Sequence, residues 1–346
     1  MFSAHPLTEV QDLGVSPLVL IVAGSCVIIA AAELARRAGR AGEPTAGADP
    51  RFTPLRPATV VLRIASVAVL ALCIVAGRLG VESQLDNIAP ALVVGLLWPL
   101  LPLLSVVVGN AWAHVDPYDT LARLTVPDPA TEEAEARRGS VYPAIAVVIA
   151  WTWYLGAWRS PLDPRSVGSA LAVYTIVILA GCLWVGRRQC LARVELFGLM
   201  CGWAGRMTKG GLGSWAPPKG TDLVMGALIG GLLFYELRSS TLWGELNISP
   251  HALLWATLGV VACCLVGAVL MRAGGFLSGS IGAGAAVAVP LALGVILALA
   301  MSRNRLFTSL QLLPGLVADP LGFNWVHAGP DLADLDPEPL GHIGLA

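Results

Sequence analysis

The chain has 346 residues, of which 56% are hydrophobic and only 13% are charged, and its formal net charge is −1. Soluble domains carry roughly 25% charged residues, so this composition excludes an ordinary soluble domain and favours a protein that is embedded in a lipid bilayer. The near-neutral charge gives no bulk attraction to nucleic acid, which we exclude as a partner.

Apolar stretches recur along the chain at lengths that suit membrane-spanning helices, which need about 20 mainly apolar residues. The eight candidate stretches are 17–34, 60–77, 88–108, 141–158, 167–185, 223–235, 252–271 and 281–301. The third has no charge from Ile88 to Val108, whereas the sixth has only a short charge-free core between Asp222 and Glu236. The predicted fold class is therefore all-α, a polytopic transmembrane helix bundle of about eight spans.

The basic residues predict how these spans are oriented. If the N-terminus is extracytoplasmic, the cytoplasmic connections carry 15 of the 22 Lys and Arg residues and the opposite side carries 6. Cytoplasmic loops are enriched in Lys and Arg, so this asymmetry predicts that both termini are extracytoplasmic. The remaining Arg63 lies inside the second span, where it either snorkels to an interface or faces the bundle interior.

Composition divides the chain into three parts. Residues 1–16 form an extracytoplasmic segment without the basic n-region of a signal peptide, so we expect the first span to be retained as an anchor. Residues 17–301 form the helix bundle with its cytoplasmic loops. Residues 302–346 form an extracytoplasmic tail that is acidic and rich in proline, with no Lys or Arg after residue 314.

One segment near 189–208 is too polar to span a membrane comfortably but has apolar residues at helical spacing. We expect a cytoplasmic helix that lies along the membrane interface. A re-entrant segment or a ninth span is the alternative.

Small residues predict close helix packing. Gly226 and Gly230 form a G-x-x-x-G pair, which lets two helix backbones approach closely in lipid, and we expect this contact to be intramolecular. The seven cysteines lie in or beside apolar runs without a C-x-x-C pair, so we interpret them as small packing residues. The sequence assigns no cofactor.

The histidines are the first candidate site. The sequence has no H-E-x-x-H, P-loop, G-x-S-x-G or dinucleotide motif. His5, His251 and His327 all fall on the predicted outer side, where they could bind Cu or Zn together with tail carboxylates. The alternative is that they are dispersed surface residues, since no two of them are close in sequence.

The second candidate site follows the third span. His114 and Asp116 could act as a catalytic acid–base pair at the cytoplasmic mouth, with Asn110 one helical turn before His114. The alternative is that Asn110 and Asp116 cap backbone groups where the span ends, before the turn at Pro117.

Several short blocks are similar to a family of bacterial, largely actinobacterial, membrane proteins that is commonly labelled fenitrothion hydrolase. The blocks with the clearest likeness are Asn87-Ile88-Ala89-Pro90, Gly109-Asn110-Ala111-Trp112, Asp116-Pro117-Tyr118 and Asp319-Pro320-Leu321-Gly322. The resemblance implies a multi-pass protein of the bacterial plasma membrane that hydrolyses organophosphorus esters. It also implies a structural motif made of Asn87, Pro90, Gly109, Asn110, Trp112, Pro117, Asp319 and Pro320.

The chain departs from this family in its last span. The family has a Tyr-His-x-x-His-Tyr segment there, whereas this chain has Ile296 and Leu299 at the two histidine positions. Any metal or proton chemistry of those histidines is absent from this sequence.

Three functions follow from these observations, and the sequence leaves open whether the protein is an enzyme. The leading hypothesis is a non-catalytic accessory or scaffold subunit that works with a membrane protein partner, because spans 3 to 8 contain no internal Asp, Glu, Lys or Arg. The alternative is a membrane-bound hydrolase of apolar, organophosphorus-type esters. A further alternative is a carrier of a neutral or lipid-like solute.

Overall fold

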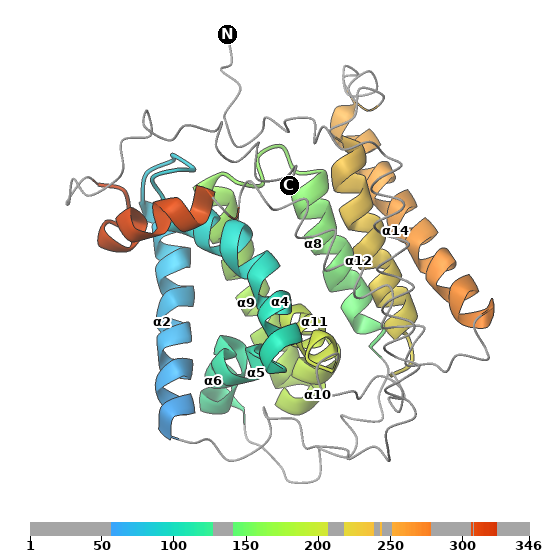
Figure 1. Ribbon diagram of the computed structural model, residues 1–346, viewed down its shortest axis with the longest axis horizontal. Coiled ribbons are helices and arrows are strands. Elements are labelled where there is room, and N and C mark those ends of the chain that lie inside the picture. The colour runs from blue at the N-terminus through green and yellow to red at the C-terminus, as the bar shows by residue number, and fades with distance from the viewer. Residues whose placement is uncertain are drawn as a thin grey trace, which may run out of the picture.

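The computed structural model describes residues 57–126, 141–206, 218–238, 243, 251–277, 306 and 308–323 (Figure 1). Within these ranges every regular element is a helix, so the predicted all-α class is confirmed for the described part of the chain. Four helices are long and apolar enough to cross a membrane: Thr59–Leu79, Ile88–Val108, Pro164–Val185 and Ala252–Arg272. They are compatible with an integral membrane protein in a lipid bilayer.

These four helices coincide with four of the stretches predicted from hydropathy. Two further predicted stretches form shorter apolar helices, α8 (Pro143–Gly156) and the apolar part of α12 (Thr221–Arg238). Stretches 17–34 and 281–301 lie outside the described residues, as do both termini. The total of eight spans and the orientation therefore stay predictions.

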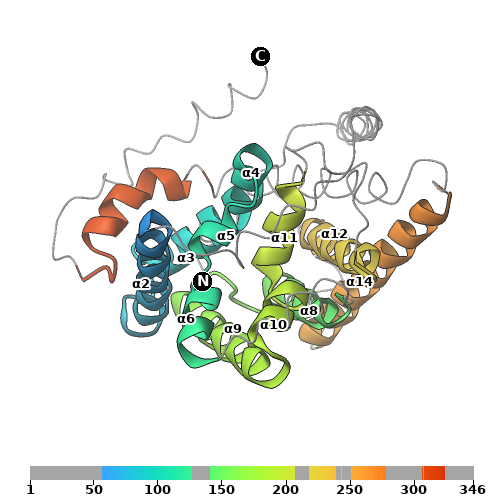
Figure 2. The same ribbon diagram turned by 90° about the horizontal axis from the view of Figure 1, so that it is seen from below.

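The described helices form two neighbouring groups. In the first, α2 (Pro57–Leu79) crosses α9 (Pro164–Val185). They meet at two glycines, and a Cβ added to Gly77 would lie 2.8 Å from the Cα of Gly168. In the second, α8 and α12 pack against α14 (Ala252–Leu277), and Figures 1 and 2 both show these three helices side by side. The aromatic rings of Trp98 in α4 (Trp98–Val108) and Trp151 in α8, 5.0 Å apart between centroids, connect the second group to the helix that lies between the groups.

The helix between these groups is continuous but changes its winding. It begins as α3 (Ile88–Pro90), continues as the π-helix η2 (Ala91–Leu97) and ends as α4 (Trp98–Val108). The N–H of Trp98 donates to the carbonyl of Val93, five residues earlier, which is the π-helical bond. Gly109 ends α4 at φ 90°, a conformation that favours glycine.

Four short helices gather near the end of α4. They are α5 (Trp112–Val115), α6 (Pro117–Thr125), α10 (Arg187–Arg193) and α11 (Leu196–Ala204), and Figure 1 shows α6 and α10 towards the lower end of α9. The last two replace the single interfacial helix that we expected near 189–208. The segment breaks at Val194 and Glu195, because the Glu195 side chain accepts hydrogen bonds from the N–H groups of Phe197 and Gly198 and so begins a new helix.

The second of these helices, α11, also differs from an interfacial helix in its burial. All of its residues except Gly202 are buried, in agreement with a segment that has no charged residue on any face. Residues 207 and 208 lie outside the described ranges.

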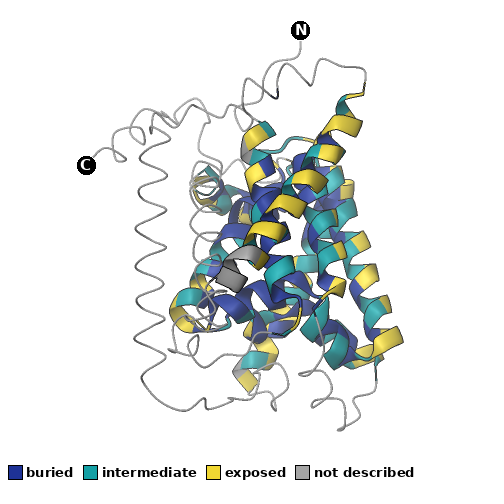
Figure 3. Cartoon of the chain, turned by 90° about the vertical axis from the view of Figure 1, so that its right-hand side faces the viewer, coloured by how far each residue is buried: buried dark blue, intermediate teal, exposed yellow. Residues whose placement is uncertain are grey.

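The outer faces of the long helices carry apolar side chains. On α14 these include Leu258, Leu265 and Leu270, and on α9 they include Ile176. Figure 3, viewed from the α14 side, shows exposed residues along the outer helix faces and buried residues in the interior. This distribution suits lipid on the outside of the bundle.

Candidate functional site

A group of four charged side chains, three of them buried, lies at the start of α6, and we call it the Asp119 cluster: Asp119, Arg63, Arg187 and Arg123. The Asp119 carboxylate accepts hydrogen bonds from Arg63 of α2 and Arg187 of α10, one at each oxygen. It also accepts a 2.9 Å hydrogen bond from Nε of Arg123, one turn further along α6. Arg63 donates in addition to the carbonyl of Ala113, at 2.7 Å.

Three of the four side chains in the Asp119 cluster are almost completely buried. The side chains of Arg63 and Arg187 are 1% exposed and that of Asp119 is 0% exposed, while Arg123 is 29% exposed. Of the two alternatives for Arg63, the structure therefore shows the one in which it faces the bundle interior. Because a buried charge is costly without a partner, the shared carboxylate ties α2, α6 and α10 into one arrangement.

Asp116 and His114 lie in different environments. Asp116 is fully buried, and its Oδ1 accepts a 2.9 Å hydrogen bond from the N–H of Asp119, so it caps α6. Pro117 follows as the first residue of that helix, where its fixed φ is favourable. His114 is exposed. Asp116 therefore has the helix-capping role that the sequence analysis gave as the alternative to an acid–base role.

The neighbouring polar residues of the third span are also held by local hydrogen bonds. Oδ1 of Asn110 accepts a 3.2 Å hydrogen bond from the N–H of Ala113, a capping role for Asn110 as well. Gly109 and Asn110 lie against Gly205, where a Cβ would approach the N of Asn110 to 2.4 Å. Glycine at position 205 therefore permits close contact between α11 and this turn.

A second buried polar group surrounds Glu195, and we call it the Glu195 cluster: Glu195, Trp112 and Tyr174. Oε2 of Glu195 accepts a 3.0 Å hydrogen bond from the indole Nε1 of Trp112, and Oε1 accepts a 3.1 Å bond from the hydroxyl of Tyr174. The same hydroxyl accepts from the N–H of Leu196, at 3.0 Å. Sequence reasoning missed this cluster, because glutamate is not among the preferred N-cap residues, although the helix dipole favours an acidic side chain at a helix N-terminus.

Tyr118 lies between the two clusters. Its ring is 6.2 Å from that of Trp112 and 5.2 Å from that of Tyr174, measured between centroids. Burial, with a further contribution from the negative charge of Glu195, raises the pKa of the Tyr118 phenol well above its usual value. The phenol is therefore neutral at physiological pH.

Two of the family-like blocks, far apart in the sequence, meet in the fold. The side-chain amide of Asn87 donates to the carbonyls of Ala76 and Val81, at 2.8 and 3.0 Å. The N–H of Ile88 donates to the carbonyl of Pro320 at 3.3 Å. Oδ1 of the neighbouring Asp319 accepts from the N–H of Phe323 at 3.2 Å. The N–H of Val81 also donates to the carbonyl of Leu321, at 2.9 Å. The bonds to Pro320 and Leu321 thus hold the loop after α2 against the segment that follows the helix Thr308–Ala318, whereas Asn87 and Asp319 make bonds within their own segments, and Pro90 is buried.

The expected metal ligands are only partly within the described residues. His251 is exposed and precedes α14, where its carbonyl accepts from the N–H of Trp255. His5 and His327 lie outside the described ranges. In the part of the chain that the structure describes, no three His, Cys, Asp or Glu residues are grouped as metal ligands.

The fold and its clusters define an α-helical protein whose apolar helices suit a lipid bilayer and whose interior is fixed by buried ion pairs. Comparison with protein-family models, with curated protein sequences and with solved structures finds no match. The assignment of a function therefore depends on the geometry described above.

Proposed function

We propose that this protein is a non-catalytic accessory or scaffold subunit that works with a membrane protein partner. The observation that carries the proposal is the Asp119 cluster, in which one carboxylate is shared by three arginines from α2, α6 and α10. Such an arrangement fixes the relative positions of helices.

The chemistry of the buried acids supports this proposal. A general acid or base must exchange its proton with a substrate, and a nucleophile must reach one. Asp119 is already held by three guanidinium groups, and Glu195 accepts from two side chains and two backbone N–H groups. These carboxylates are therefore suited to positioning helices.

A partner has a suitable surface at the end of the bundle that carries α6 and α10. Trp184, at the end of α9, is 90% exposed, and Leu124, at the end of α6, is 81% exposed. Large aromatic side chains of this kind are frequent anchors in protein interfaces. We therefore propose that a membrane protein partner contacts this end of the chain.

Affinity purification from native membranes in mild detergent tests the proposal. We expect a stoichiometric membrane protein partner with the wild type, and its loss in Trp184→Ser. The matched control is Leu310→Ser, which changes an exposed apolar residue on the helix Thr308–Ala318. A purified chain that carries no partner would contradict the accessory function, as would a partner retained equally by Trp184→Ser.

The family resemblance supports a second candidate, a hydrolase of apolar organophosphorus esters. Its participants would be His114 and Asp116, or His5, His251 and His327 with a metal. The test measures bound copper, zinc and iron together with ester hydrolysis, in the wild type and in His251→Ala and His327→Ala. Stoichiometric metal and turnover that are lost in either variant would replace the accessory proposal with the hydrolase.

A further inference from the structure

The helix Thr308–Ala318 runs across the end of α2. In Figure 1, α2 stands upright and this helix, drawn in red, crosses its upper end. Figure 2 looks along α2 and shows the red helix along its length, so this helix crosses the direction of α2. It is also shorter than the roughly 20 residues that a spanning helix needs. Because α2 contains a candidate span, the crossing helix follows the membrane surface and does not pass through the bilayer.

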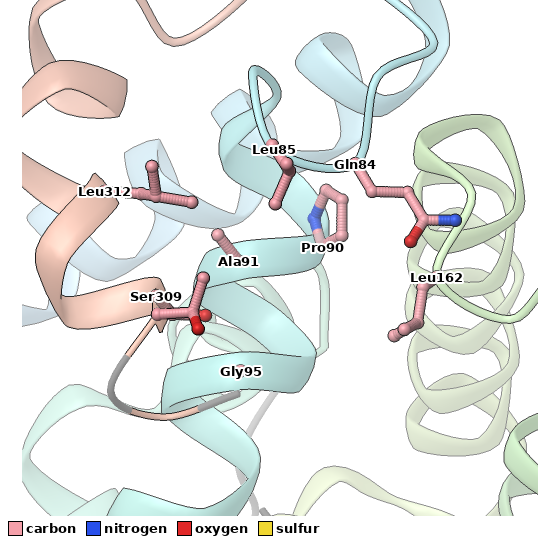
Figure 4. A pocket seen from close by; sticks show the side chains of 9 residues that line it. Gln84, Leu85, Pro90, Ala91, Gly95, Leu162, Ser309 and Leu312 are labelled. Carbon is pink, nitrogen blue, oxygen red and sulfur yellow. The ribbon is translucent and has the colours of Figure 1, made fainter. Parts of the chain in front are cut away.

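One face of this helix packs on the bundle. Its residues Leu312 and Leu316 are buried against the ends of the two neighbouring spans, and Figure 4 shows Leu312 beside Ala91. The hollow between this helix and η2 is only about 20 Å³, space for about one water molecule. The segment after the helix is held by the hydrogen bonds that Pro320 and Leu321 accept. Packing and hydrogen bonds together therefore fix the helix on the bundle.

The packing partners place this helix at the depth of the membrane boundary. It contacts Ala76, three residues before the candidate span of α2 ends at Leu79. It also contacts Ala91, three residues after the next span begins at Ile88. Three helical residues correspond to about 5 Å. Helices that lie in the membrane interface are typically buried by about 5–10 Å, so the depth of this helix agrees with an interfacial position.

The opposite face of the helix exposes apolar side chains. Leu310 and Val317, which are two turns apart and therefore share one side of the helix, are 45% and 63% exposed. Phe323, shortly after the helix, is 46% exposed. An isolated interfacial helix turns a polar face to water, whereas here the buried face packs on protein and the helix carries no charged residue. At this depth, acyl chains are the surroundings that suit such a face.

We infer that the helix Thr308–Ala318, together with Phe323, is a membrane-surface anchor whose exposed apolar side chains insert into the lipid leaflet at the end of α2. The predicted orientation makes this the extracytoplasmic leaflet. The partner of this surface is the lipid itself. The inference does not depend on the accessory function proposed above.

Spin labels in the full chain, reconstituted in lipid nanodiscs, test the inference. A nitroxide amino acid replaces Leu310, Val317 or Phe323, one at a time. Electron paramagnetic resonance measures how often each label collides with oxygen, which concentrates in hydrocarbon, and with a water-soluble nickel chelate. We expect a higher oxygen-to-nickel ratio at these positions than at Glu82, an exposed loop residue. The ratio should be lower than at Ile176, an exposed residue near the middle of the α9 span.

A charged variant separates insertion into lipid from mere proximity to it. Val317→Asp should lower the oxygen-to-nickel ratio of the label at position 310 towards the value at Glu82, because a charged side chain is disfavoured in hydrocarbon. The matched control Val317→Ile keeps the apolar contact and should leave the ratio unchanged. Thermal unfolding of each variant identifies loss of fold. If Val317→Asp is unstable, the labels in the otherwise unchanged chain decide the outcome.

Three results would overturn the inference. The first is an oxygen-to-nickel ratio at positions 310 and 317 that equals the ratio at Glu82, which would place the helix in water. The second is a low collision rate with both reagents, which would show that protein covers this face. The third is a folded Val317→Asp variant in which the ratio at position 310 is unchanged.

Discussion

Trp112 and Glu195 are 83 residues apart in the sequence, and the indole Nε1 of Trp112 donates a 3.0 Å hydrogen bond to Oε2 of Glu195. The same carboxylate caps α11 and receives the hydroxyl of Tyr174. One buried acid therefore connects α5, α9 and α11. Its bonds are charge-assisted, a class that is stronger than bonds between neutral groups.

Glu195→Gln should destabilise the protein by about 2–4 kcal/mol, because the amide NH₂ cannot accept and would face N–H donors that are buried. The measurement is thermal or denaturant unfolding in detergent, followed by tryptophan fluorescence. The control is Glu82→Gln, whose carboxylate pairs with Arg165 where both side chains are at least 60% exposed. Equal stability of the two variants would contradict the role assigned to Glu195.

Asp119→Asn should be more severe, with a loss of about 3–5 kcal/mol, since it leaves Arg63 and Arg187 buried without their shared anion. Adding Arg63→Met should restore part of this loss, because it removes one of the uncompensated charges. The control is Asp222→Asn, which breaks the exposed pair with Arg272 and should cost at most about 1 kcal/mol. Unfolding midpoints and the yield of monodisperse protein are the measurements.

Gly230→Ala should destabilise the contact between α12 and α14 by about 1–3 kcal/mol. A Cβ at this position would lie 2.0 Å from the carbonyl oxygen of Cys263, which belongs to the helix backbone. Gly202→Ala is the matched control, because its Cβ would lie 3.6 Å from the Asn110 amide, an ordinary contact. If both variants unfold at the same temperature, the close approach at Gly230 is not important for stability.

The G-x-x-x-G contact and the positions of the four long apolar helices could be predicted because their signals are local. An uninterrupted apolar run from Ile88 to Val108 requires a helix of that length in lipid, and the structure has it. Gly226 and Gly230 were expected to pack within the chain, and they lie against Gly267 and Cys263 of α14. Hydropathy and residue size are sufficient for such predictions.

The clusters could not be predicted because their members come from separate elements. Arg63 and Arg187 are 56 and 68 residues from Asp119, and the sequence indicates only that a basic residue inside a span needs an interior partner or an interface. The segment near 189–208 was misinterpreted for a related reason. The helical spacing of its apolar residues was interpreted as one amphipathic helix. In the structure the hydrogen bonds that Glu195 accepts from the N–H groups of Phe197 and Gly198 divide the segment into α10 and α11.

The last prediction concerns the alkaline behaviour of Tyr118. An unfolded tyrosine ionises near pH 10, whereas burial and the charge of Glu195 raise the pKa of Tyr118 in the folded chain. The stabilisation is thus fully present below about pH 10 and is lost progressively as the pH rises from there to the raised pKa, because in this range only the unfolded chain releases the proton. We expect the stability of the wild type to fall above about pH 10 more steeply than that of Tyr118→Phe, measured by denaturant midpoints on both sides of this pH. Tyr142→Phe removes an exposed tyrosine and is the control, and identical alkaline slopes in the wild type and Tyr118→Phe would show that the phenol ionises equally in both states.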